Sequence, residues 1–365
     1  MSSLEIALPL NDIDIDILLA LEKEGAKTST RNLSKILDIP DRTIRYRLNR
    51  LKEKELLHPL FIQTYERKIG LAEKALFLRS VPSKESALKD ILDKIPIFYN
   101  YATTHGTYDG FIVYSMFPIA SSHMITRLAE EMKDAGLIED YYEFDLVDYR
   151  TKGVNVEAFL TGHEWDWQRW YGEIGKIIDD CETVDMNFEE FPQVVSFDFK
   201  DIQIIMNMIE NAEITLKELS EILQLSQPQV HKRIKSLEDS GIIRGYKPSF
   251  RPFKDGTSVG IVFKSRKHAK EILCAIHRLP FFVSFAMENI NHYFLTIYVP
   301  SGEMNSLLQG INRIKQYTDE FFTQTLICVT TKGHLHLLKN YNQETKQWDI
   351  PVSDYINLIR EKSQQ

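Results

Sequence analysis

Cysteine is scarce in this chain of 365 residues. Its three cysteines, Cys181, Cys274 and Cys328, lie far apart, so the sequence contains no C-x-x-C pair, disulfide framework or zinc spacing. We therefore expect no metal site and a reducing compartment such as the cytoplasm. The first residues lack the basic region and long apolar core of a signal peptide. No apolar run approaches the ~20 residues that span a bilayer, so we expect no membrane partner.

A basic excess is also missing, because 44 Lys and Arg residues stand against 52 Asp and Glu residues, a net charge of −8. Proteins that coat nucleic acid nonspecifically are usually basic overall, so a role in nucleic-acid binding requires a local patch. The acidity is concentrated in residues 139–190, which hold 15 acidic and 4 basic side chains, and the rest of the chain carries a net charge of +3. A hydrophobic content of 43% and a charged content of 26% exclude disordered, collagen-like and coiled-coil proteins.

The chain contains an internal repeat, because residues 14–60 align with residues 201–246 after the insertion of one residue. The triplet at 151–153, Thr-Lys-Gly, recurs at 331–333, and each copy is followed by a Trp-bearing, helical stretch. The sequence therefore predicts two copies of one unit of roughly 180 residues, joined near residues 191–197. Chance similarity of two helical stretches is the alternative, and the recurring triplet counts against it.

Each unit begins with a pattern of three short helices. Apolar residues of the first unit recur at helical spacing in residues 12–22, 30–37 and 41–55. We expect Thr30 to cap the second helix, and in the second unit Ser226 and Gln229 form a capping-box pattern, with Pro228 in the first turn. The apolar stretch after each third helix suits a β hairpin. Three helices and such a wing form a winged helix-turn-helix, whose third helix enters the DNA major groove.

The rest of each unit alternates between strand and helix periodicity. In the first unit the strands are expected at 72–81, 97–104, 110–117 and 140–148, and the helices at 83–95 and 120–136. This β-α-β-β-α-β order predicts a ferredoxin-like sandwich, and the second unit repeats it. We therefore expect an α+β fold in six segments: a winged helix-turn-helix at 8–66, a ferredoxin-like sensor domain at 67–150, an acidic linker at 151–196, a second winged helix-turn-helix at 197–252, a second sensor domain at 253–334 and a tail at 335–365.

This architecture resembles the Lrp/AsnC (leucine-responsive, or feast/famine) family of prokaryotic transcription regulators. The segment RIKSLEDSGIIRGY at 233–246 is similar to that family's recognition-helix exit and wing. The turn HGTYD at 105–109 is similar to the family's Gly-x-Tyr-Asp turn, where effector amino acids bind between paired sensor domains. The resemblance implies a sequence-specific regulator of double-stranded DNA whose effector site includes Gly106, Tyr108 and Asp109. A plain hairpin turn is the alternative reading of these three residues.

Family members usually carry one unit per chain, so the fusion of two units implies an intramolecular pseudo-dimer and leaves further homo-oligomers open. The second half lacks the turn, because residues 288–293 contain neither its Gly nor its Asp. An effector site of the family's kind is therefore expected to be asymmetric or lost.

The third helix of the first unit carries the most concentrated positive charge, with six basic and two acidic residues between positions 41 and 54. Arginine pairs bidentately with guanine or phosphate, and asparagine can read adenine. We expect DNA contacts from Arg42, Thr43, Arg45, Tyr46, Arg47, Asn49 and Arg50, and in the second unit from Gln229, His231, Lys232, Arg233 and Lys235. Arg47 and Arg233 lie nearer the buried edge and either reach phosphate or brace the fold. A solvated helix face is the alternative for the whole set.

Two other functions remain open. Some tetrapyrrole (siroheme-type) decarboxylases resemble this family and can be fused in pairs; the nearest histidines for such chemistry are His105, His123, His277 and His292. A sensor or interaction module, whose helix-turn-helix units only pack or dimerise, is the third possibility. The basic helix and the Gly-x-Tyr-Asp turn favour the regulator, and no Ser-His-Asp order, Gly-rich phosphate loop or H-E-x-x-H motif is visible. We therefore expect that the chain is not an enzyme and needs no cofactor.

Overall fold

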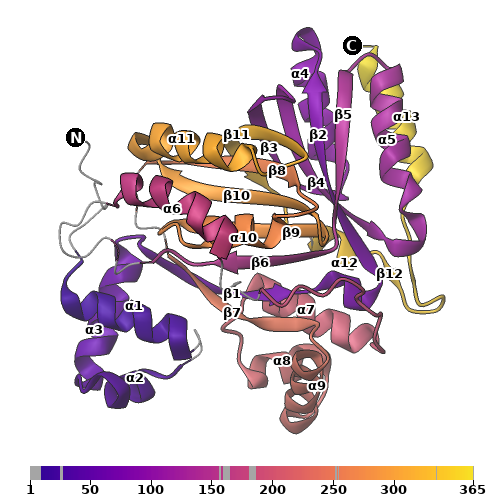
Figure 1. The fold of residues 1–365 in the computed structure, drawn as a ribbon. Coiled ribbons are helices and arrows are strands. Elements are labelled where there is room, and N and C mark those ends of the chain that lie inside the picture. The colour runs from indigo at the N-terminus through magenta and orange to yellow at the C-terminus, as the bar shows by residue number, and fades with distance from the viewer. Residues whose placement is uncertain are drawn as a thin grey trace.

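Two groups of three short helices occupy the start and the middle of the chain (Figure 1). The structure is a computed structural model that describes residues 10–24, 28–155, 158, 165–180, 186–250, 253, 255–333 and 335–364. The N-cap of the second helix is Ser29, one residue before the predicted Thr30, because the Ser29 side chain accepts the Asn32 amide. The predicted capping box of Ser226 and Gln229 is confirmed. The helices are α1 (Asp12–Glu24), α2 (Thr30–Leu37), α3 (Asp41–Glu53), α7 (Phe199–Glu210), α8 (Leu216–Leu223) and α9 (Gln227–Asp239).

The strands that follow these groups pair with each other. β1 (Leu57–Thr64) and β7 (Ile243–Phe250) form a two-stranded antiparallel ribbon with Leu57 opposite Phe250 and Ile62 opposite Tyr246. The predicted hairpin within each wing is therefore wrong. Each unit supplies one strand, and its backbone groups are satisfied by the strand from the other half of the chain.

Two β-α-β-β-α-β segments follow the two helix groups, which confirms the predicted α+β class and its ferredoxin-like character. Their strands run in the orders β5-β2-β4-β3 and β11-β8-β10-β9. The first segment contains β2 (Leu71–Ser80), α4 (Glu85–Lys94), β3 (Phe98–Gly106), β4 (Gly110–Pro118), α5 (His123–Asp134) and β5 (Ile138–Leu146). The second contains β8 (Gly256–Lys264), α10 (Ala269–His277), β9 (Phe282–Asn289), β10 (His292–Pro300), α11 (Met304–Lys315) and β11 (Glu320–Thr331).

The strands of both segments belong to one nine-stranded sheet, which β6 (Asp148–Lys152) completes at the edge beside β9. β5 lies at the other edge, yet only Val147 separates β5 from β6 in the chain, and the Val147 amide binds the Met287 carbonyl in β9. The sheet must therefore curl until its two edges meet. Its inner face encloses an apolar cluster from both halves, in which the Phe77 and Phe294 rings lie 5.2 Å apart.

Each of the two Thr-Lys-Gly triplets contacts the opposite half of the chain through its lysine. Lys152 is the last residue of β6 and donates to the Leu279 carbonyl just beyond α10. Lys332 follows β11, which pairs with β3, and it donates to carbonyls at the end of α4, including Asp93 at 3.2 Å and Ile95 at 3.0 Å. Carbonyls at a helix C-terminus lack intrahelical partners and attract cations. Each lysine thus caps a helix of the opposite half.

The helical segment that follows each ferredoxin-like segment also packs on the opposite half of the chain. α6 (Trp167–Asp180) packs on α10 and α11, and α13 (Val352–Ser363) packs on α4 and α5. Trp170 Nε1 donates to the Ala275 carbonyl at 3.0 Å, and a Cβ on Gly310 would meet the Trp170 ring at 2.0 Å. Trp170 therefore covers the helix layer of the second half. The remaining elements of the C-terminal tail are α12 (Leu335–Leu338), β12 (Tyr341–Asn342) and β13 (Gln347–Trp348).

Within the described ranges, none of the helices combines the length and the apolar character needed to traverse a membrane. The described residues likewise contain no group of three or more His, Cys, Asp or Glu side chains arranged to hold a metal ion.

Candidate nucleic-acid interface

The outer face of α3 is open to solvent. Ile44 and Leu51 are buried with α1 and α2, which turns the opposite side of the helix outward. The Tyr46 residue is 62% exposed and the Arg45 side chain 63% exposed. The other predicted residues of this face are exposed or half-buried: Arg42, Thr43, Asn49 and Arg50. These side chains could reach a duplex without rearrangement of the helix group.

Three predicted arginines pair with carboxylates inside their own helix group. Arg45 binds Asp41 at 2.7 Å on the solvent-exposed side of α3, whereas the other two bind carboxylates of the first helix of their group. Arg47 lies 3.5 Å from the buried Asp14 carboxylate in α1. Arg233 binds Asp198 at 2.9 Å and Asp201 at 2.8 Å at the start of α7. The two arginines occupy equivalent positions and tie the third helix of each group to its first helix. These contacts support the bracing alternative for both.

The outer face of α9 is less basic. His231, Lys232 and Lys235 are exposed. The Gln229 side-chain oxygen accepts from the Ser226 amide at 2.9 Å, as the capping box requires. Of the three Lys and Arg residues in this helix, Arg233 is paired with carboxylates of α7, and Glu238 and Asp239 follow. In Figure 1, α1–α3 lie to the left of the β1–β7 ribbon, and α8 and α9 lie below it.

The turn between β3 and β4 is filled by a side chain from the second half. Gln324, buried in β11, accepts from the Tyr108 amide at 3.1 Å and donates to both the Tyr108 carbonyl and Thr104 Oγ1. Gly106 has φ +150°, and a Cβ there would lie 2.3 Å from Gln324 Oε1. The Asp109 side chain is 67% exposed and contacts the His105 ring. On the inner side of the turn, the Tyr108 backbone amide and carbonyl are already hydrogen-bonded to Gln324. These contacts support the alternative of a plain turn there.

The four candidate histidines lie in different surroundings. His105 and His123 are exposed. His277 at the end of α10 is half-buried, and burial together with nearby Lys152 lowers its pKa. His292 is 2% exposed; its Nε2 lies 2.8 Å from the Tyr142 hydroxyl and its Nδ1 contacts Glu288. His292 alone combines deep burial with a carboxylate and a phenol as ring partners.

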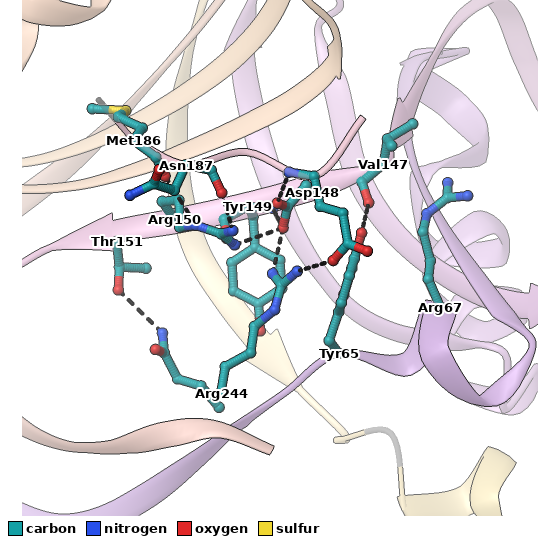
Figure 2. A network of polar contacts seen from close by, with 12 residues as sticks. Tyr65, Arg67, Val147, Asp148, Tyr149, Arg150, Thr151, Met186, Asn187 and Arg244 are labelled. Atoms are coloured by element: carbon teal, nitrogen blue, oxygen red, sulfur yellow. Dashed lines mark hydrogen bonds and ion pairs between the residues drawn. The ribbon is translucent and has the colours of Figure 1, made fainter. Parts of the chain in front are cut away.

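A buried carboxylate at the junction of the two halves escaped the sequence analysis. The Asp148 side chain is 0% exposed and binds Arg150 at 2.8 Å, Arg244 and the amides of Tyr149 and Glu189, both at 2.7 Å (Figure 2). In the sequence, Asp148 is one of the 15 acidic residues between positions 139 and 190, and no local pattern marks it as buried. Arg150 and Arg244 both reach Asp148 only because β6 pairs with β9 and lies beside the β1–β7 ribbon.

The Arg244 guanidinium also lies over the Tyr65 ring, 3.3 Å from its centroid. The Tyr65 hydroxyl donates to the Val147 carbonyl at 2.8 Å (Figure 2). Burial, reinforced by Asp148, raises the pKa of Tyr65 well above its ordinary value. The junction thus links the ribbon, β6 and the linker residue Glu189 in one polar network that joins the helix groups to the sheet.

Two segments of the chain match the winged helix-turn-helix DNA-binding family, residues 10–57 and 199–244. The "Uncharacterized HTH-type transcriptional regulator YezC" of Bacillus subtilis (strain 168) is 39% identical over 49 residues. That alignment covers 13% of this chain and 35% of the relative, so the chain spans about a third of the curated relative's length. These matches support a regulator-like character for the helix groups.

The fold of nearly the whole chain is similar to that of the siroheme decarboxylase NirDL. The two proteins are 10% identical, with a TM-score of 0.55 over 96% of this chain and 97% of that chain. In the complex with an iron-uroporphyrin III analogue the shares are 87% and 92% at the same TM-score. The E. coli AsnC structure is 19% identical over 38% of this chain and 93% of that chain, with a TM-score of 0.31.

The prediction that the chain is not an enzyme is therefore wrong. The prediction relied on the absence of known catalytic motifs and on the basic helix. The fold similarity with the enzyme NirDL covers 96% of this chain. One fold can carry unrelated functions, so this architecture does not separate regulators from enzymes. At 10% identity the likeness shows the fold alone.

The half-buried Glu73 of β2 is expected to make the stability of the chain depend on pH. Burial and the neighbouring Glu66 raise the pKa of Glu73 from 4.5 to about 8. The folded chain holds the Glu73 proton more tightly than the unfolded chain. The contribution of Glu73 to the free energy of unfolding is therefore fully present below about pH 4.5 and is lost as the pH rises through about 8. We expect Glu73→Gln to raise the melting temperature relative to wild type at pH 8.5 and to change it little at pH 4.5, as measured by calorimetry. The exposed Glu139→Gln is the control, and equal pH dependence in both variants would contradict the assignment.

Proposed function

We propose that this chain is a transcription regulator of the Lrp/AsnC type that binds double-stranded DNA through its two helix groups. The observation that carries the proposal is the solvent-exposed basic face of α3, which belongs to a segment matching the winged helix-turn-helix DNA-binding family. In this proposal the residues that contact DNA are Arg42, Thr43, Arg45, Tyr46, Asn49 and Arg50 in the first helix group, and Gln229, His231, Lys232 and Lys235 in the second. Arg47 and Arg233 hold these helices in place.

The two halves form an intramolecular pseudo-dimer that arose by tandem duplication. Three reciprocal contacts support this part of the proposal: β1 with β7, the crossing strands β6 and β11, and the crossing tails α6 and α13. Such exchanges are what two identical chains would make across a two-fold axis. The six segments expected from the sequence are the boundaries that we propose for its domains.

An effector would act asymmetrically on this regulator. Asp109 and His105 face solvent on the outer side of the turn between β3 and β4. On the inner side of this turn, Gln324 forms hydrogen bonds with the Tyr108 backbone. We therefore restrict the proposed amino-acid site to the outer side, around Gly106, Tyr108 and Asp109. A thermal-shift series over the common amino acids tests it, and an Asp109→Asn variant that keeps the full shift would contradict it.

Binding of genomic promoter fragments at two salt concentrations tests the regulator. A protein that makes six to ten phosphate contacts loses about 10³–10⁵ in affinity between 50 and 200 mM salt. We expect retention of some fragments at low salt and a steep loss on addition of salt. If no fragment is retained at low salt, the chain is not a DNA-binding regulator. A shallow salt dependence would instead point to the sensor or interaction module.

A tetrapyrrole decarboxylase is the second candidate, favoured by one specific observation, the fold similarity with NirDL over 96% of the chain. In this reading the buried His292, held between Glu288 and Tyr142, is the histidine best placed for proton transfer. A porphyrin titration tests the candidate. A Soret-type absorbance change that His292→Ala abolishes, together with no DNA retention, would select the enzyme.

A further inference from the structure

The first turns of the two third helices, α3 and α9, differ in what they present. In a helix-turn-helix the N-terminal residues of the recognition helix contact base edges in the major groove. In α3 these residues include Arg42 and Thr43, and the N-cap is Pro40, whose ring offers no polar atom for capping. Arg42 is exposed, and its guanidinium has the fork geometry that pairs with the two acceptors of guanine. The first turn of α3 is therefore suited to base readout.

The first turn of α9 lacks such a side chain. Both helices are 13 residues long and align end to end, which places Pro228 at the position of Arg42 and Gln229 at that of Thr43. Proline has no hydrogen-bonding side chain. The Gln229 side-chain oxygen accepts from both the amide and the hydroxyl of Ser226, each at 2.9 Å. Glutamine reads adenine with its oxygen and nitrogen together, so the capping role of Gln229 removes it from bidentate readout.

The later turns of the two helices differ in the same direction. Asn49 and Arg50 of α3 correspond to Lys235 and Ser236 of α9. Asn49 is exposed, and asparagine pairs bidentately with adenine. A lysine ammonium is a point charge on a flexible stem, which suits contact with phosphate, and a serine hydroxyl pairs with more than one base. α3 thus carries base-reading side chains where α9 carries a cation for the backbone.

Arg45 and its counterpart His231 do not decide this difference. The Arg45 guanidinium binds Asp41 at 2.7 Å and Thr30 at 3.4 Å, so two of its nitrogens are engaged within the first group. The two ring nitrogens of His231 diverge, so this ring does not form the parallel pair of hydrogen bonds that defines bidentate readout. Base readout by the first group therefore depends on the other exposed residues of α3.

The charge of the second and third helices is also unequal. α2 and α3 together hold seven basic and two acidic residues, whereas α8 and α9 hold four of each. Arg47 and Arg233 are engaged with carboxylates of the first helices, and Lys52 lies 3.8 Å from Glu213. With these three cations set aside, five basic and two acidic residues remain on α2 and α3, against three basic and four acidic residues on α8 and α9. The second group therefore neutralises less phosphate charge than the first.

We propose that the first helix group alone reads base sequence, and that the second group holds the phosphate backbone through Lys232 and Lys235. This inference rests on the proposed DNA-binding function and names the class of DNA, a site with one specific half and one nonspecific half. Two equal units read an inverted repeat across a two-fold axis, and these two units are not equal. The preferred duplex therefore has a direction, and the bound chain has one orientation on it.

Selection from a pool of random duplexes, each about three helical turns long, tests the inference with the full-length chain. We expect the retained duplexes to share one block of conserved bases, without an inverted copy one or two helical turns away. Two inverted blocks of equal strength would overturn the inference and leave the regulator intact. If no duplex is retained at low salt, the proposed function fails and the inference fails with it.

Variants of α3 test the readout itself. Asn49→Ala should lower the discrimination at one base pair of the block by about tenfold, because the bidentate pair is lost. Arg42→Lys keeps the charge and should retain most of the affinity, yet it should relax the preference at another base pair, because the guanidinium fork is gone. Both positions are exposed, and circular dichroism verifies that the variants fold. If both variants select the same block as wild type with the same preferences, the inference is wrong.

Lys232→Ala with Lys235→Ala is the matched variant of α9. It should weaken binding to all duplexes by the same factor and lower the salt slope by about two, because two phosphate contacts are lost. It should also select the same block as wild type. A changed base preference in this variant would show that α9 reads bases, and the inference would then be wrong.

Discussion

Replacement of Arg42, Arg45 and Arg50 by alanine in one chain should abolish retention of duplex DNA at 150 mM salt. Each phosphate contact contributes about 0.9 to the salt slope, and each bidentate contact with guanine contributes about 1–3 kcal/mol. The loss of three such groups therefore lowers the affinity by roughly a thousandfold or more. Fluorescence anisotropy with a retained promoter fragment measures both the affinity and the slope.

A charge-matched control separates the interface from the net charge. Arg127, Arg169 and Arg266 are exposed and lie outside both helix groups, and their replacement by alanine removes the same charge. The ion pairs of Arg169 and Arg266 are exposed and contribute little to stability. Equal losses in the two triple variants would show that α3 has no special role. The double variant Lys232→Ala with Lys235→Ala should weaken binding less than the α3 triple, because α9 presents fewer cations.

Asp148→Ala should lower the free energy of unfolding by about 3–5 kcal/mol, since it leaves two partly buried guanidinium groups without their shared carboxylate. Urea denaturation measures the loss. The Asp148 side chain is 0% exposed, so solvent screens the interaction little. The effect on stability should exceed that of any surface carboxylate in the chain.

Asp140→Asn is the matched control, because Asp140 is 48% exposed and pairs only with Lys133 at 3.3 Å among the ion pairs of the described residues. We expect it to change stability by less than about 1 kcal/mol. The double variant Asp148→Ala with Arg244→Met should recover part of the loss, because one orphaned charge is gone. Equal losses for Asp148→Ala and Asp140→Asn would show that the junction contributes nothing beyond a surface ion pair.

The helix groups and the β-α-β-β-α-β segments were predictable because their signals are local. Apolar spacing along α3 and the capping box at Ser226 each depend on residues within a few positions, and such residues interact whatever the distant chain does. The outward face of α3 followed from the same spacing. Whether that face contacts DNA stays a prediction, and the enzyme prediction was wrong because function is not set by local pattern.

The contacts at the junction of the two halves could not be predicted from local sequence patterns. One of the two arginines that bind Asp148 is Arg244, 96 residues away, and Gln324 contacts a turn 216 residues from its own position. The two Thr-Lys-Gly triplets are a repeat in the sequence, but which helices their lysines cap depends on the pairing of β6 and β11 with strands of the opposite half.

The sequence alone determined the two helix groups, the order of strands and helices in the two β-α-β-β-α-β segments and the uneven distribution of charge, since each depends on neighbours along the chain. The tertiary structure decided which strand pairs with which, which tail covers which half and which charges are buried. The reason is physical: an open strand edge or an uncovered apolar face is satisfied by whatever surface the whole chain brings to it, and that choice is settled only when both halves fold together.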